Sequence, residues 1–327
     1  MAAPIIDFHV HFSDRELAMK GANKNVMTGF GANPIAPAKP EDGWRYEIMQ
    51  KVANPAMQIA DMDKFGIGMH LISLIAVSCN TDWAEPAEAA SLNRHANEMV
   101  AGWVSQHPTR FVGSFTLPLQ DVPLALKELD HAVNTLKLKV VSLSSNCRGD
   151  YLGEAKFRPI WEAIHGYGLP VFIHPHGSTD MRLQKYFLWN GIGQPIEEAR
   201  VMTSLIFEGV LDTFPGLKLV MAHGGGYLPH YMGRLDRNFE NVPETRKNMS
   251  KRPSAYLRDF YFDTCVYGPD VLEALIKKVG VDRIVFGTDY PVGERDPFET
   301  LKTCTVLSEA DREMITRTTP AKILGFA

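Results

Sequence analysis

Short apolar runs alternate with longer amphipathic stretches along most of the chain. Eight runs have the length of a β-strand, at residues 5–11, 68–75, 111–117, 138–143, 170–174, 217–223, 260–265 and 283–289. Helices with one apolar face are predicted at 54–65, 91–107, 122–136, 157–167, 181–214 with a break near 190–193, 228–239, 270–279 and 309–324. Near-continuous apolar strands separated by helices predict a parallel sheet that is covered on both faces.

The number of strand–helix units favours a closed barrel. Eight such units make a (β/α)8 TIM-like barrel of the α/β class, and 327 residues fall within the usual range of roughly 200 to over 400. A doubly wound open sheet is the alternative, but it usually has fewer strands and a glycine-rich first turn, and no G-x-G-x-x-G follows the first run. We therefore predict a single barrel domain over residues 1–327.

One stretch, at 13–43, interrupts the alternation. It holds many Gly, Asn, Pro and Ala residues without a clear period, so we predict a loop insertion after the first strand. Loops of this length in a compact domain usually have a function, for example as a lid over a site.

The first apolar run carries three polar residues at alternating positions. Asp7, His9 and His11 would lie on one face of a strand, and two imidazoles two residues apart can aim at one divalent metal ion. A buried strand with incidental histidines explains the same pattern, so this run leaves both interpretations open.

Polar residues at the ends of other strands favour the metal. Catalytic groups of a barrel lie at the carboxyl ends of its strands. Four of the eight predicted strands end in histidine or aspartate, namely His9 and His11, then His174, followed two residues on by His176, then His223 and lastly Asp289. Packing does not explain four such ends, because buried polar groups need partners. Three imidazoles and a carboxylate suit Zn²⁺ with an open position for water or substrate.

Composition excludes several kinds of partner. Hydrophobic residues make up 45% and charged residues 22% of the chain, as in ordinary globular proteins, and the net charge of −4 gives no basic surplus for nucleic acid or an anionic membrane surface. We expect no membrane span or signal peptide, because no apolar run approaches ~20 residues and the N-terminus leads directly into the first strand. The four cysteines are scattered, which indicates free thiols in a reducing cytoplasm: Cys79, Cys147, Cys265 and Cys304.

Four motifs resemble those of a known family. They are His9-Val10-His11, Ile173-His174-Pro175, Ala222-His223-Gly224-Gly225-Gly226 and Gly287-Thr288-Asp289-Tyr290-Pro291. In order and spacing the chain resembles the amidohydrolase superfamily, in the branch of aminocarboxymuconate-semialdehyde decarboxylase and the hydroxybenzoate decarboxylases. The likeness extends over nearly the whole chain.

The resemblance implies roles for five residues. His9, His11, His174 and Asp289 would bind one catalytic divalent metal, with zinc preferred and manganese as the alternative, and no organic cofactor. His223 would be the base that activates water at the metal and later handles the proton. Asp289 would also accept a hydrogen bond from that water. A neutral imidazole, with its ordinary pKa near ~6.5, is well matched to proton transfer at neutral pH.

The resemblance also suggests how substrate is held. Arg234 would reach across a homodimer interface to a substrate carboxylate, although a plain surface position is the alternative, and Arg45 would be a second clamp. A guanidinium suits this task because its planar fork binds carboxylate bidentately. His176 stands where aminocarboxymuconate-semialdehyde decarboxylase has tryptophan, so it would contact the substrate and alter its identity. Trp189 would wall the pocket or belong to the core.

The function implied is that of a cytoplasmic, metal-dependent, non-oxidative decarboxylase acting on a small unsaturated or aromatic carboxylic acid. It would be a carbon–carbon lyase of aromatic compound catabolism. A hydrolase or hydratase of a ring-cleavage product on the same barrel is the alternative, because a fold does not fix a function. A binding protein with a structural metal is a third hypothesis, but His223 would be a fifth polar group at a site that four ligands already complete.

Overall fold

A parallel sheet of eight strands forms the centre of the molecule. The computed structural model describes residues 3–21, 24, 39–178 and 180–326. Neighbouring strands all run parallel in the order β1-β2-β3-β4-β7-β8-β9-β10. These strands are β1 (Ile6–Phe12), β2 (Met69–Leu74), β3 (Phe111–Phe115), β4 (Val140–Leu143), β7 (Pro170–Ile173), β8 (Lys218–Met221), β9 (Phe260–Asp263) and β10 (Ile284–Val285).

The sheet closes on itself between its first and last strands. Val10 forms a parallel bridge with Tyr290, and the amide of Phe8 donates to the carbonyl oxygen of Phe286 at 2.8 Å. A short antiparallel hairpin, β5 (Asn146–Cys147) and β6 (Asp150–Tyr151), lies outside the barrel order. The predicted (β/α)8 barrel is therefore confirmed.

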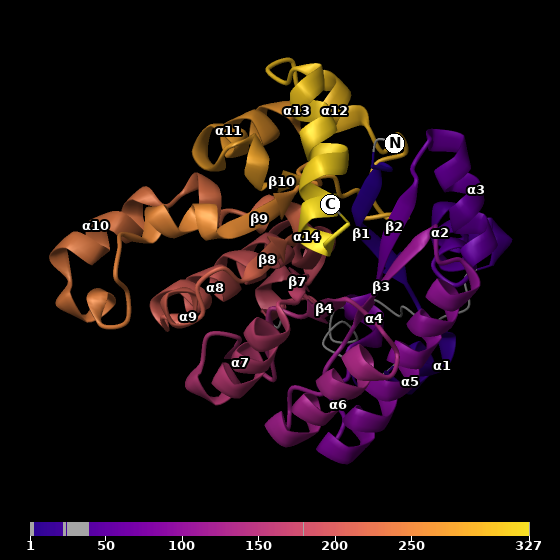
Figure 1. Ribbon diagram of the computed structural model, residues 1–327, viewed down its shortest axis with the longest axis horizontal. Coiled ribbons are helices and arrows are strands. Elements are labelled where there is room, and N and C mark those ends of the chain that lie inside the picture. The colour runs from indigo at the N-terminus through magenta and orange to yellow at the C-terminus, as the bar shows by residue number, and fades with distance from the viewer. Residues whose placement is uncertain (1–2, 22–23, 25–38, 179, 327) are drawn as a thin grey trace.

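Helices surround the strands on the outside of the barrel (Figure 1). They are α1 (Arg15–Gly21), α2 (Trp44–Lys51), α3 (Pro55–Phe65), α4 (Ala76–Cys79), α5 (Pro86–Gln106), α6 (Val122–Asn134), α7 (Arg158–Tyr167), α8 (Gln194–Phe207), α9 (Val210–Thr213), α10 (Gly233–Asn241), α11 (Pro269–Val279), α12 (Glu299–Thr303), α13 (Glu309–Glu313) and α14 (Thr319–Leu324). Within the described segments, no helix has the length and apolar character needed to cross a membrane.

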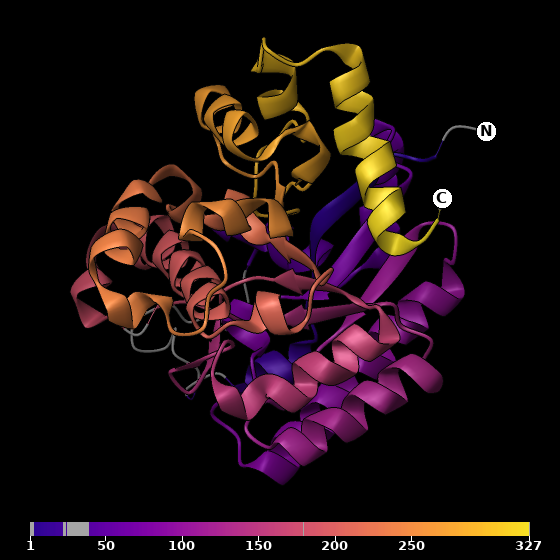
Figure 2. The same cartoon turned by 60° about the vertical axis from the view of Figure 1, so that its left-hand side comes forward.

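Two apolar cores follow from the alternation of strand side chains. Inside the barrel, Phe8, Phe172 and Val220 pack together with other inward residues of the strands, and α14 contributes Ile323 to the same cluster. Their sequence neighbours, such as Val171, face outward into a larger core beneath the helices. The helix α14 thus lies against β1 and β10, as both views of the molecule indicate (Figure 1 and Figure 2).

Residues typical of helix ends lie where three of the predicted helices begin or end. The side chain of Asn54 accepts from two amides at the start of α3, and Asp121 does the same for one amide of α6, as N-cap residues do. Gly168 ends α7 in the left-handed region, where glycine is favoured. The predicted helices at 54–65, 122–136 and 157–167 therefore match to within a few residues.

The predicted loop at 13–43 was partly wrong. Arg15–Gly21 is helix α1, in which Leu17 and Ala18 are buried, and Pro40–Asp42 is a 3₁₀ turn. The amide of Leu17 donates to the Asp14 carboxylate at 2.7 Å, a local bond that helps to start the helix. Residues 22–23 and 25–38 of the predicted insertion lie outside the described residues.

Candidate metal and catalytic centre

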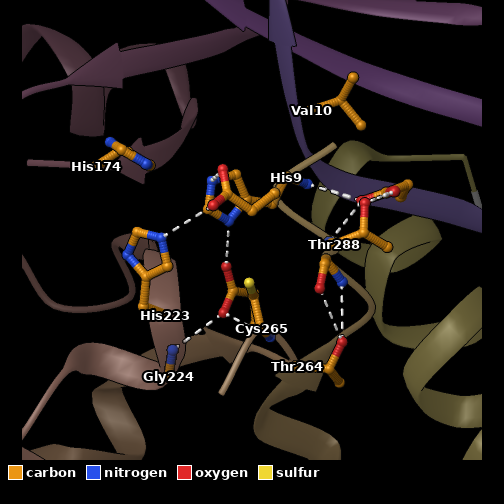
Figure 3. Close-up of polar contacts among 12 residues, drawn as sticks. His9, Val10, His174, His223, Gly224, Thr264, Cys265 and Thr288 are labelled. Carbon is orange, nitrogen blue, oxygen red and sulfur yellow. Dashed lines mark hydrogen bonds and ion pairs between the residues drawn. The ribbon is translucent and has the colours of Figure 1, made fainter. Parts of the chain in front are cut away.

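Four polar side chains converge at the carboxyl ends of the barrel strands. Among the described residues, His9, His174, His223 and Asp289 each offer a ligand atom, and these atoms all lie within 4.8 Å of one another. The three imidazoles point toward one another in Figure 3. Their ring centroids are 5.0–5.1 Å apart, and His9 and His174 are almost fully buried. The barrel interior thus ends in a compact polar group.

A bulge in β1 brings His9 into this group. Asp7 pairs with His70 of β2, whereas Val10 pairs with Ile72, so β1 has one residue more than β2 over this interval. Phe8 and His9 both contact the inward ring of Phe172 as a result. Strict alternation could not place both of them inside the barrel.

The same bulge corrects the prediction for Asp7. Asp7 was expected on the face of His9 and His11, but it lines an outer pocket together with Met62 and His70. There it accepts from the Thr288 amide at 3.2 Å and from the Thr288 hydroxyl at 2.5 Å. Burial raises its pKa to about 7, although the bonds from Thr288 oppose this rise. Asp7 therefore ties β1 to the segment that carries Asp289.

His223 and Asp289 lie in turns beyond the ends of their strands. The strands β8 and β10 end at Met221 and Val285, earlier than predicted. His223 has a φ of 48° and Asp289 a φ of 58°, both in the left-handed region that residues other than glycine rarely adopt. Ala222 belongs to the inner core, so alternation alone would point His223 outward. The left-handed turn directs its ring into the site, and such outliers cluster at functional sites.

Three imidazoles have their Nδ1 atoms occupied. Nδ1 of His9 hydrogen-bonds to the Asp263 carboxylate at 2.7 Å, and Nδ1 of His174 to the carbonyl oxygen of Pro175 at 2.8 Å. Nδ1 of His223 hydrogen-bonds to the carboxylate of Glu198, from α8. A proton held on Nδ1 leaves the Nε2 lone pair free, which is the arrangement seen in metal-binding histidines.

The residues fit a divalent metal ion. Nε2 of His9 is buried and, among the described residues, has no hydrogen-bond partner, although Asp289 Oδ1 lies 3.3 Å away. Buried polar atoms without a partner are rare, and an ion would satisfy this one. Imidazole nitrogens and a carboxylate oxygen are ligands that zinc and manganese both accept.

Buried charge sets the protonation of the group. Burial raises the pKa of Asp289, but the charge of His9 and the bond from His11 hold it well below its ordinary value. Burial lowers the pKa of His9, but Asp289 and Asp263 together raise it to about 9. Burial and the neighbouring imidazoles lower the pKa of His174 well below its ordinary value. A divalent ion would therefore compete with a proton for Nε2 of His9.

His11 lies beside the group instead of within the set of four. Its Nε2 hydrogen-bonds to Asp289 Oδ1 at 2.7 Å, and its ring lies 5.0 Å from that of His174. Its Nδ1 is buried and lacks a hydrogen-bond partner within the described segments. His223 Nε2 lies 3.7 Å from the other carboxylate oxygen of Asp289. Asp289 thus has His9 and His11 beside Oδ1 and His223 beside Oδ2.

The four residues predicted to hold substrate have different surroundings. Arg45 is half-buried in α2, and Arg234 is exposed in α10. Trp189 is 7% exposed, with the ring of Phe187 against it at 4.6 Å. His176 is buried, and its Nε2 lies 3.6 Å from the Asp82 carboxylate. Of these four, only His176 lies within two residues of a member of the central group.

Two carboxylates of the site were missed in the sequence. Asp263 ends β9 directly after Phe262, so it had the same strand-end signal as the histidines. Glu198 lies within α8 and is fully buried, and an acidic residue in an amphipathic helix gives no sign of this. Both act on an imidazole through its Nδ1 atom.

A family model and several known proteins match most of this chain. The model of the amidohydrolase family matches residues 6–326. The 2-amino-3-carboxymuconate-6-semialdehyde decarboxylase of Dictyostelium discoideum is 30% identical over 284 residues, which are 86% of this chain and 79% of that protein. A gamma-resorcylate decarboxylase of a Polaromonas species is 32% identical over 270 residues, 78% of this chain and 82% of that one.

A solved structure is similar over the whole length. It is the dihydroxybenzoic acid decarboxylase of a Polaromonas species, with bound manganese and the inhibitor 2-nitroresorcinol. Its TM-score is 0.82 at 26% identity, and the match covers 99% of this chain and 97% of that chain.

Proposed function

The chain belongs to the amidohydrolase family, and on this premise we propose that it is a metal-dependent, non-oxidative decarboxylase of a small aromatic or unsaturated carboxylic acid. It is then a carbon–carbon lyase that releases CO₂ without an oxidant or an organic cofactor. The observation that carries the proposal is the convergence of three imidazoles and one carboxylate at the mouth of the barrel. Relatives named as decarboxylases support it.

The metal ligands in this proposal are His9, His11, His174 and Asp289. Proximity and the bonded Nδ1 atom favour a set with His223 in place of His11. The proposal keeps His11 as the ligand and His223 as the proton carrier because the resemblance of the motifs implies these roles. A bound divalent ion would supply positive charge that orients an anionic substrate and makes water more acidic. Manganese in a solved relative supports Mn²⁺, and the imidazole-rich ligand set also suits Zn²⁺.

His223 would move the proton that decarboxylation requires. When the bond between carbon and carboxylate breaks, the electron pair stays on that carbon, and a proton must replace CO₂ there. Burial lowers the pKa of His223, but the charges of Glu198 and Asp289 raise it well above its ordinary value. With Nδ1 bonded to Glu198, Nε2 of His223 is the atom that would take up the proton and deliver it to that carbon.

Arg234 and a second subunit would complete substrate binding. Arg234 is exposed, and the exposed rings of Tyr227 and Tyr231 precede it. Exposed tyrosines and arginines are enriched at protein interfaces. We include a homodimer in the proposal, with Arg234 reaching the substrate carboxylate of the partner and Arg45 as a clamp within the subunit. Trp189 would wall the pocket.

Two further parts of the proposal concern the whole chain. A single sheet that includes β1 and β10 supports one domain over residues 1–327. The described cysteines are all free and buried, which supports a reducing compartment such as the cytoplasm.

Product analysis tests the proposal. Protein loaded with Mn²⁺ or Zn²⁺ is incubated in D₂O with a panel of hydroxybenzoic and unsaturated acids, and CO₂ is measured together with the product by NMR. We expect CO₂ release and one deuterium at the carbon that lost it. A product that retains its carboxylate and gains the elements of water would instead establish a hydrolase or hydratase.

A further inference from the structure

A buried histidine and a partly buried aspartate face each other near the barrel mouth without forming a hydrogen bond. His176 Nε2 lies 3.6 Å from Asp82 Oδ2, which is too far for a hydrogen bond. Both His176 Nδ1 and Asp82 Oδ2 are buried atoms that have no hydrogen-bond partner within the described segments. Because nearly all buried polar atoms are satisfied in folded proteins, a further polar group is expected between or beside them.

The pair joins two loops that start far apart around the barrel. Asp82 follows β2 and His176 follows β7, and the strand order places β3 and β4 between these two strands. The loop that carries Asp82 therefore crosses the ends of β3 and β4. A cavity of about 40 Å³ lies on the Asp82 side of the pair, and its lining includes Asp82, Ser142 and Ser144 but, among the described residues, not His176. One hydroxyl-sized group fits, because a water molecule in the liquid occupies only about 30 Å³.

This pair is also close to the candidate metal centre. Only Pro175 separates His176 from His174, so their Cα atoms are at most about 7 Å apart. Arg148 fixes the loop of Asp82 on its outer side, because its Nε donates to the Asp82 carbonyl oxygen at 2.7 Å and its Nη2 to the Ala84 carbonyl oxygen at 2.8 Å. The backbone of the loop that carries Asp82 is therefore held in place before any ligand binds.

We propose that Asp82 and His176 form a subsite that recognises a hydrogen-bond donor, a hydroxyl or amino group, on the substrate away from its carboxylate. This inference rests on the proposed function. An ionised carboxylate only accepts hydrogen bonds, so Asp82 selects a donor and disfavours a second carboxylate. A substrate hydroxyl would donate to Asp82 and accept from an N–H of His176. An ether oxygen cannot donate and would leave Asp82 without its partner.

Matched ligands and variants test this subsite. The probes are the 2,3-, 2,4-, 2,5- and 2,6-dihydroxybenzoates, each paired with the ether in which the second hydroxyl is methylated. Their affinities for the Mn²⁺-loaded full chain are measured by calorimetry, which does not require turnover. For at least one isomer we expect the hydroxyl form to bind the unaltered chain about tenfold or more tightly than its ether, the effect of one hydrogen bond to a charged group.

The variant Asp82→Ala should remove this preference without changing manganese content or the affinity for the ether. His176→Phe should weaken hydroxyl and ether alike, because the oxygen of either probe can accept from His176. Glu85→Ala is the matched control, since it removes an acid three positions along the same loop, with a side chain 86% exposed, and should keep the preference. The inference is overturned if no isomer shows a preference for the hydroxyl form, or if that preference survives in Asp82→Ala. It is also overturned if Asp82→Ala weakens the binding of hydroxyl and ether equally. Absence of CO₂ release from every probe and from the unsaturated acids of the wider panel would refute the proposed function instead, because the affinities are measured separately.

Discussion

Asp263 holds the ring of His9 by a hydrogen bond of 2.7 Å between two side chains that are both fully buried. The other oxygen of Asp263 accepts from the amides of Gly224 and Cys265, at 3.0 and 3.1 Å (Figure 3). One carboxylate therefore fixes a candidate ligand on β1 and the turn that follows His223.

Asp263→Asn should weaken metal binding by roughly 10- to 100-fold, the usual effect of losing a group that orients a ligand. The amide oxygen would stay with the two backbone amides, and the NH₂ group would then face Nδ1 of His9. That ring would carry its proton on Nε2, where the lone pair is needed. Metal titration of the variant measures the loss. Asp259→Asn changes the residue just before β9, at the opposite end of that strand, and should bind metal normally.

His223→Asn and His11→Asn distinguish the base from the ligands. If His223 only moves protons, its variant should keep the metal and lose about 10²- to 10⁴-fold in kcat, the usual contribution of a general acid–base. His11→Asn should lose metal, because it lacks one of the proposed ligands. Metal analysis by mass spectrometry and steady-state kinetics on the same samples provide both readouts. Metal loss in His223→Asn together with retention in His11→Asn would reverse the two roles.

Removal of the metal should abolish activity and lower stability. Chelator-treated protein is expected to release no CO₂ and to recover on addition of Mn²⁺ or Zn²⁺. A ligand that binds only the folded state stabilises it by about 2.7 kcal/mol at a free concentration of 100 times Kd. The melting temperature should therefore rise with metal concentration. Full activity in the metal-free protein would contradict the proposed chemistry.

His70 should make the fold sensitive to acid. It lies in β2, 1% exposed, with Nδ1 3.2 Å from Gln58 Oε1, and burial with the charge of Arg110 lowers its pKa to about 3. The unfolded chain takes up a proton near pH ~6.5, whereas the folded chain does not, so stability is complete above that pH and falls as the pH drops toward 3.

Because of His70, the free energy of unfolding should fall with decreasing pH at a slope that approaches about 1.4 kcal/mol per pH unit. Urea unfolding at pH 7, 6 and 5 measures it, with His70→Gln as the control in which this component is absent. Equal pH dependence in the two proteins would show that His70 is protonated in the folded state.

The apolar pattern of the sequence determined the architecture. Eight runs of strand length separated by amphipathic stretches predict a parallel closed barrel, because only strands buried on both faces tolerate such continuous apolar character. Strand ends then marked His9, His174, His223 and Asp289, since the carboxyl ends of parallel strands meet at one edge. These predictions needed only the pattern of apolar and polar residues within short segments of the chain.

Tertiary structure decided which way each side chain points. The bulge in β1 depends on pairing with β2, and it sends Asp7 outward while His9 turns inward. The left-handed turns at His223 and Asp289 depend on what surrounds them after folding. Glu198 and Asp82 come from a helix and a loop, and no period in the sequence relates them to His223 or His176. Contacts between distant segments arise from packing of the whole barrel, so they could not be predicted from local pattern.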